Sequence, residues 1–185
     1  MSDLPSRPLY LVLPGINDSG PDHWQTAWER GLVGARRVLA PDWDRPVCAE
    51  WVASLEHAVS RSGPDVVLIA HSLGCLQVVH WARRTRLVVR GAFLVAPPNP
   101  DGDSFPEEAT GFAPLPMARL AFASTLVASA DDPFAGADFS RRCAAAWGSR
   151  LIDIGPRGHV NAASGLGDWP EGRPLLDDLS PSALR

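Results

Sequence analysis

Six short apolar runs alternate along this chain with segments of helical periodicity, and this alternation limits the folds that the chain can adopt. The runs cover residues 8–15, 37–40, 65–70, 90–95, 124–129 and 150–154. Strands with so few polar positions are typical of a parallel sheet that is covered on both faces. Parallel neighbours need long crossover connections, and these are nearly always right-handed. The alternation therefore predicts a doubly wound α/β fold with a mostly parallel central sheet of about six strands.

Helical periodicity marks the connections between several of these runs. Trp24, Trp28 and Leu32 recur at i, i+4 and i+8, which places them on one stripe of a helix. Helices are predicted over residues 22–32, 47–60, 74–86 and 139–147. Such helices would lie on both faces of the sheet and cover its apolar strands.

The chain as a whole fits one globular domain. It has 185 residues, of which 45% are hydrophobic, and this is enough to build a sizeable core. We find no internal repeat and no linker, so a single domain is predicted over residues 1–185. The segment 96–116 is rich in proline, glycine and acidic residues and is too long for an ordinary connection. It is either a lid or binding loop, or a poorly ordered surface excursion. The chain after His159 is loop-rich, and Trp169 is expected to anchor it to the core.

Charge and cysteine usage argue against several classes of function. The net charge is −4, and every basic side chain is an arginine. This negative charge argues against binding to nucleic acid or to a membrane surface, because either would call for a basic stripe. The first residues lack the apolar region of a secretory signal, and no apolar run is long enough to span a bilayer. Cys48, Cys75 and Cys143 show no CxxC spacing, so we expect reduced thiols in a cytoplasmic protein, without disulfides or a zinc site.

Ser72 follows the third apolar run in the pentapeptide Ala70-His71-Ser72-Leu73-Gly74. A serine nucleophile at a sharp strand-to-helix turn has the pattern G-x-S-x-G, because large neighbours would not fit the strained turn. Alanine replaces the first glycine here and is small enough to fit. The pattern predicts a nucleophile, and the alternative is a hydroxyl on a tight turn.

A serine nucleophile needs a base, and five histidines compete for this role. His57 and His80 fall inside predicted helices, and His71 adjoins the serine but is expected to point off the turn. His159 follows the sixth apolar run in a glycine-flanked turn, where open α/β sheets place functional groups. His159 is therefore the predicted base, and the alternative is a surface loop histidine.

The acid that orients the base should follow the fifth apolar run, since the order Ser, Asp, His is expected on this fold. Asp131 and Asp132 both lie there, and either could instead cap the turn before Pro133. An oxyanion hole needs two backbone N–H groups. Leu73 would supply one, and the loop after the first run would supply the other, from Ile16 or alternatively from Asn17.

Four stretches of the chain together resemble a known family: PGINDSGPDHWQTAW, AHSLG, ASADDPF and GHVNAASGLGDWPEG. They look like the small serine hydrolases of the retinoblastoma-binding-protein-9/YdeN-like family, within the α/β-hydrolase superfamily. The resemblance runs from Leu9 to about Gly172. It implies a compact fold without a separate cap domain and a triad of Ser72, Asp132 and His159. The departures from the family pattern are the alanine in the turn and a loop-rich C-terminal part without a clear final helix.

These observations predict a serine hydrolase that cleaves small esters or related acyl compounds and needs no metal or organic cofactor. His23, Trp24 and Asn17 are candidates to line the substrate pocket. Amide or thioester cleavage would use the same triad. The alternative from another class is a protein-binding module on a hydrolase scaffold, because fold does not determine function and the resemblance also suggests a protein partner.

Overall fold

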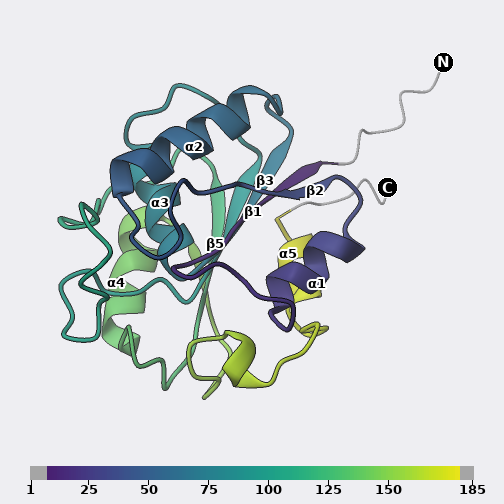
Figure 1. Cartoon of the computed structure of the whole chain (residues 1–185). Helices are drawn as coiled ribbons and strands as arrows, with labels where there is room; N and C mark the ends of the chain where they lie inside the picture. The colour runs from purple at the N-terminus through teal and green to yellow at the C-terminus, as the bar shows by residue number, and fades with distance from the viewer. Residues whose placement is uncertain (1–7, 180–185) are drawn as a thin grey trace.

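The computed structural model describes residues 8–179 and contains one six-stranded parallel sheet (Figure 1). Its strands are β1 (Leu9–Leu13), β2 (Ala35–Arg37), β3 (Val66–His71), β4 (Gly91–Val95), β5 (Ala123–Ala128) and β6 (Arg150–Asp153). They lie in the order β2-β1-β3-β4-β5-β6, and each neighbouring pair is parallel. The predicted single-domain α/β fold is confirmed.

Helices cover both faces of the sheet, as Figure 1 shows. On one face lie α2 (Cys48–Ser60), α3 (Leu73–Ala82) and α4 (Ala137–Trp147); on the other lie α1 (Trp24–Gly31) and the short α5 (Arg173–Asp177). Because successive strand residues point to opposite faces, the apolar run of β3 serves two cores at once. Leu68 and Ala70 pack in the core under α2, α3 and α4, whereas Val67 and Ile69 pack in the core under α1. This explains why the strand sequences show no polar alternation.

The core under α1 is built largely from aromatic rings. Trp28 stacks on Trp169, with ring centroids 5.6 Å apart, and Trp24 meets both rings edge-on. The indole N–H of Trp28 also donates to the backbone carbonyl of Asp168. Trp169 is thus buried and anchors the loop after His159, as the sequence predicts.

The chain reverses its direction across the sheet between β1 and β3. From β1 the chain continues to β2 on one side, and β3 then lies on the other side of β1. Ligands of open α/β sheets bind beyond the carboxyl ends of the strands at such a switch point. The loop after β1 and the turn after β3 therefore meet at the expected position of a binding site.

Three element predictions were wrong in detail. The helix predicted over residues 74–86 is α3, which ends at Ala82. The second strand covers Ala35–Arg37 rather than residues 37–40, because its hydrogen bonds to β1 pair Tyr10 with Ala35 and set the register. The C-terminal part does contain a final helix, α5, whose Leu176 is fully buried in the aromatic core. Its five residues are too few to give a visible helical period in the sequence. None of the described helices combines the length and the apolar character that a membrane span requires.

Candidate active site

Ser72 lies at the apex of the turn between β3 and α3 and has a strained backbone. Its φ of 53° and ψ of −124° fall outside the regions that L residues favour. The turn brings α3 against the end of β1, so a side chain on Gly74 would collide with the backbone oxygen of Leu13 and lie 2.8 Å from that of Pro14. Glycine is therefore required at position 74, whereas Ala70 fits within the buried strand.

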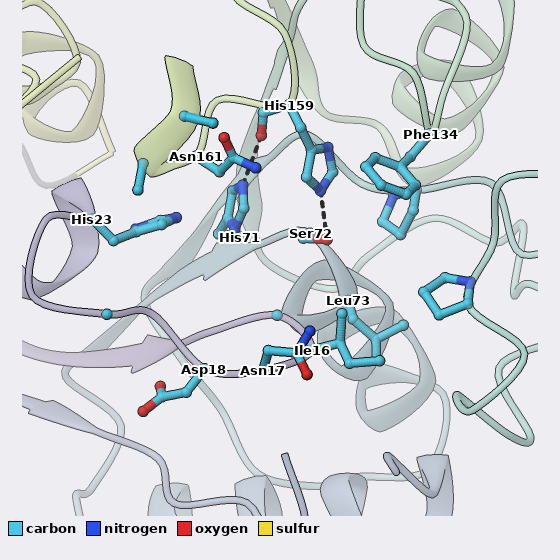
Figure 2. A pocket seen from close by; sticks show the side chains of 16 residues that line it. Ile16, Asn17, Asp18, His23, His71, Ser72, Leu73, Phe134, His159 and Asn161 are labelled. Atoms are coloured by element: carbon cyan, nitrogen blue, oxygen red, sulfur yellow. Dashed lines mark hydrogen bonds between the residues drawn. The ribbon is translucent and has the colours of Figure 1, made fainter. Parts of the chain in front are cut away.

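Ser72, His159 and Asp132 form one continuous hydrogen-bonded chain. His159 Nε2 lies 2.7 Å from Ser72 Oγ, and His159 Nδ1 lies 2.9 and 3.0 Å from the two carboxylate oxygens of Asp132 (Figure 2 draws the Ser72 link). All three residues are at most 9% exposed. In this arrangement the carboxylate accepts the Nδ1 proton, which leaves the Nε2 lone pair for the serine hydroxyl.

Asp131 has a different position from its neighbour. Its Oδ1 accepts hydrogen bonds from the Ser129 hydroxyl and from the backbone N–H of Gly158, at 2.9 and 2.7 Å. These bonds, the Gly158 N–H first, lower the pKa of the exposed Asp131 carboxyl. Asp131 thus holds the loop before His159, and Asp132 is the aspartate that contacts the ring.

The backbone around His159 is held by two further side chains. The Nε2–H of His71 donates to the carbonyl of His159 at 2.8 Å, and the indole N–H of Trp24 donates to the carbonyl of Val160, also at 2.8 Å. Val160 has a φ of 51°, which is unfavourable for a β-branched residue. These bonds from β3 and α1 fix the orientation of the histidine across the top of the sheet.

Two backbone N–H groups near Ser72 are free to stabilise an anion. The N–H of Leu73 opens helix α3, where the first N–H groups have no partner within the helix. The N–H of Ile16 makes no hydrogen bond to any residue of the described chain, whereas that of Asn17 donates to the carbonyl of Trp43 at 2.8 Å. Ile16 therefore fits the position of a second donor, and Asn17 does not.

A cavity of about 430 Å³ opens beside Ser72, within the range of small-molecule sites. The predicted residues Ile16, Asn17 and His23 line it. Trp24 does not line it: its ring is 1% exposed and belongs to the aromatic core, so its assignment to the pocket was wrong. The other lining residues are Gly15, Asp18, Gly20, His71, Ser72, Leu73, Pro98, Pro106, Phe134, His159, Asn161, Ala162 and Ala163.

The segment 96–116 forms part of the cavity wall through Pro98 and Pro106. It is attached to the body of the protein at several points. Asn99 N–H donates to the carbonyl of Phe134, and Thr110 N–H donates to that of Pro46. Phe112 is 1% exposed and accepts a hydrogen bond from the ring of His80 through its carbonyl. The segment is thus attached to α3, to the residues before α2 and to the loop that contains Phe134.

The cysteines are buried free thiols with little nucleophilic character. Burial raises the pKa of Cys48 to about 11 and that of Cys143 to about 12, and it raises that of Cys75 well above its usual value. Because the thiolate is the reactive form, such thiols are inert. Among residues 8–179, no three His, Cys, Asp or Glu side chains are grouped so as to hold a metal ion.

Several residues that build the site could not be identified from the sequence. His71 lines the cavity, and its ring donates to the backbone carbonyl of His159. Arg37, from the edge strand β2, pairs with Asp18 and Glu29 and so ties the loop after β1 to helix α1. Phe134 packs on the His159 ring with centroids 4.5 Å apart. Each contact joins segments that only tertiary packing brings together.

The parallel sheet, the strained serine turn and the Ser72–His159–Asp132 chain together define the α/β-hydrolase class. The model of the serine hydrolase family matches residues 10–178, so the chain belongs to this family. No curated protein gives a match to the chain.

Several solved structures resemble this chain. A YdeN-like hydrolase from Pectobacterium atrosepticum is 29% identical, with a TM-score of 0.83 over 94% of this chain and 90% of that chain. The ydeN gene product of B. subtilis is 20% identical, with a TM-score of 0.76 over 95% and 100%. A carboxylesterase from Bacillus cereus is 17% identical, with a TM-score of 0.54 over 86% of each chain. The last two show the fold alone, and the predicted resemblance to YdeN-like hydrolases is confirmed.

Proposed function

We propose that this serine hydrolase is a carboxylesterase that cleaves small esters through Ser72, His159 and Asp132. The observation that carries the proposal is the unbroken chain from Ser72 Oγ through the His159 ring to the Asp132 carboxylate, with distances of 2.7 to 3.0 Å. His159 takes the serine proton as Oγ attacks the acyl carbon, and the imidazolium that forms is stabilised by Asp132. The N–H groups of Leu73 and Ile16 stabilise the negative oxygen.

The second half of the reaction uses the same groups. His159 protonates the leaving alcohol as the ester C–O bond breaks, and water then attacks the acyl-enzyme with His159 again as base. The acid is released as the bond between the acyl carbon and Ser72 Oγ breaks and His159 returns the proton to Oγ. In both halves His159 transfers the protons, and the backbone N–H groups of Leu73 and Ile16 stabilise the negative oxygen. A cytoplasmic location remains a prediction from the sequence, which fractionation of the producing cell would test.

The test is labelling with a fluorophosphonate probe beside hydrolysis of p-nitrophenyl esters. We expect the wild type to be labelled and to turn over short esters, and Ser72→Ala to lose both properties. Ser62 follows helix α2, and its hydroxyl bonds only the carbonyl of Ala58 and the side chain of Arg36. Ser62→Ala is the control variant and should retain both properties. Equal labelling of Ser72→Ala and wild type would disprove the assignment of the nucleophile. Labelling without turnover of ester, thioester or amide panels would favour a binding role.

A further inference from the structure

A buried hydrogen-bond donor in the cavity wall has no partner. His23 is 5% exposed and caps helix α1, where its Nδ1 accepts the backbone N–H of Gln25 at 3.1 Å. The ring proton must then be on Nε2, and within residues 8–179 nothing accepts it. Burial, followed by the charge of Arg37, lowers the pKa of His23 to about 4, so the ring is neutral at pH 7. Native proteins rarely leave a buried donor unpaired, because an unmade hydrogen bond is costly, so this donor points to a bound ligand.

An acceptor lies beside this donor. His71 uses its Nε2–H for the carbonyl of His159, so its Nδ1 carries a lone pair. Burial lowers the pKa of His71 well below the usual value, so this ring is also neutral. The centroids of the His23 and His71 rings are 4.7 Å apart in an edge arrangement, and no hydrogen bond joins the two rings. Figure 2 shows His71 between His23 and His159, and all three line the cavity that contains Ser72.

We propose that His23 Nε2–H and His71 Nδ1 form a polar subsite that binds a hydroxyl group on the acyl chain of the substrate. A hydroxyl accepts one hydrogen bond and donates another, which matches one donor beside one acceptor. A carboxylate would face the lone pair of His71, and an ammonium group would face the N–H of His23. A purely alkyl chain would leave the His23 donor unpaired. This inference rests on the proposed hydrolase function.

The geometry around His159 assigns the subsite to the acyl part of the substrate. The leaving group must lie next to His159 Nε2, which protonates it. A second hollow, of about 420 Å³, shares His159 and Phe134 with the cavity but is lined by neither His23 nor His71, so it can take the leaving group. His23 lies beyond His71, whose ring centroid is 5.0 Å from that of His159. The acyl chain is therefore the part that reaches the His23–His71 pair.

The test compares p-nitrophenyl esters in pairs that differ by hydroxyl against methyl at the same carbon. The pairs are 2-hydroxypropanoate with 2-methylpropanoate, 3-hydroxybutanoate with 3-methylbutanoate, and 4-hydroxybutanoate with pentanoate. A site built to bond a hydroxyl rejects the analogue that lacks it, so we expect the wild type to prefer at least one hydroxy ester by about tenfold or more in kcat/KM.

Two variants of His23 should remove this preference. His23→Asn keeps a side chain that caps helices well but lacks the ring nitrogen in the cavity, and His23→Phe keeps a ring without a donor. We expect the hydroxyl-to-methyl ratio of kcat/KM to fall to about one in both. His57→Asn changes an exposed histidine on α2 and should keep the wild-type ratio. Loss of the ratio in His57→Asn, or its retention in both His23 variants, would overturn the proposal.

A binding measurement separates this inference from the proposed function. In Ser72→Ala, at least one of the three hydroxy acids should raise the melting temperature more than its methyl partner does, and the addition of His23→Asn should abolish the difference. Ratios near one for every pair in the wild type, together with equal thermal shifts, would show that no hydroxyl binds there. If Ser72 is not labelled by fluorophosphonate but the thermal difference is present, the subsite stands and the esterase proposal fails.

Discussion

The adjacent residues Asp131 and Asp132 occupy different environments. Asp132 is 9% exposed, and both of its carboxylate oxygens lie within 3.0 Å of His159 Nδ1. Asp131 is exposed and accepts hydrogen bonds from Ser129 and Gly158. If the proposed mechanism holds, one carboxylate orients the catalytic base and the other supports only its loop. A conservative substitution at each position separates these roles.

Asp132→Asn should lower kcat for ester hydrolysis by about 10³–10⁴-fold, because an amide at this position favours the wrong tautomer of His159. Asp131→Asn keeps an oxygen that can accept the Gly158 N–H, and its kcat should remain within about tenfold of the wild type. Steady-state kinetics with one p-nitrophenyl ester measures both. A larger loss in Asp131→Asn than in Asp132→Asn would contradict the assignment of the acid.

At the scale of elements, the site depends on the close approach of the loop after β1 to the turn after β3. A side chain on Gly15 would place its Cβ 2.8 Å from the Cβ of Ser72 and 3.2 Å from its hydroxyl oxygen. The loop is held in place from the other side by Arg37, whose guanidinium pairs with Asp18 and also donates to the carbonyl of Ser19. The nucleophile and the Ile16 N–H therefore keep a fixed separation.

Gly15→Ala should displace Ser72 or the loop by several tenths of an ångström and lower kcat/KM by about 10- to 100-fold, since small misplacements of reacting groups are costly. The matched control is Gly31→Ala at the end of α1, where nothing lies within 4 Å of the added methyl group. It should leave kcat/KM unchanged and stabilise the helix by up to about 1 kcal/mol. Kinetics and urea denaturation of both variants provide the measurement. Full activity of Gly15→Ala would show that the loop after β1 can move away from Ser72 without a loss of kcat/KM.

At the scale of the whole molecule, two neutral histidines are buried between α1 and β3. Burial lowers the pKa of His23 to about 4, and it lowers that of His71 well below its usual value. The unfolded chain takes up a proton on each histidine below a pH of about 6.5, whereas the folded protein does so only at lower pH. Between pH 4 and 6.5 the unfolded state thus binds more protons, so the free energy of unfolding rises with pH.

We expect this free energy to fall on going from pH 7 to pH 4, with a contribution of up to about 3 kcal/mol from His23. Urea denaturation at several pH values measures the fall in the wild type and in His23→Asn. The variant should show a smaller fall, because its side chain does not titrate. Parallel curves for the two proteins would show that His23 does not resist protonation in the fold.

The sequence was informative wherever a local pattern reports a local environment. The apolar run of residues 65–70 predicted β3, because a strand buried on both faces has no polar position. The small residues around Ser72 predicted a sharp turn, and Gly74 is required there by contact with β1. The position of β2 was missed, because an edge strand of three residues takes its register from β1 rather than from its own side chains.

By itself the sequence determined the α/β class, the order of strands and helices, and Ser72, His159 and the pair Asp131–Asp132 as candidates for a triad. Burial patterns and turn residues are encoded locally, and the family resemblance favoured Asp132. Only the tertiary structure decided that Asp132 contacts His159, that Trp24 supports Val160 instead of the pocket, and that His23 and His71 face one cavity. These contacts join residues 27 to 136 positions apart, and packing of the helices on the sheet brings them together.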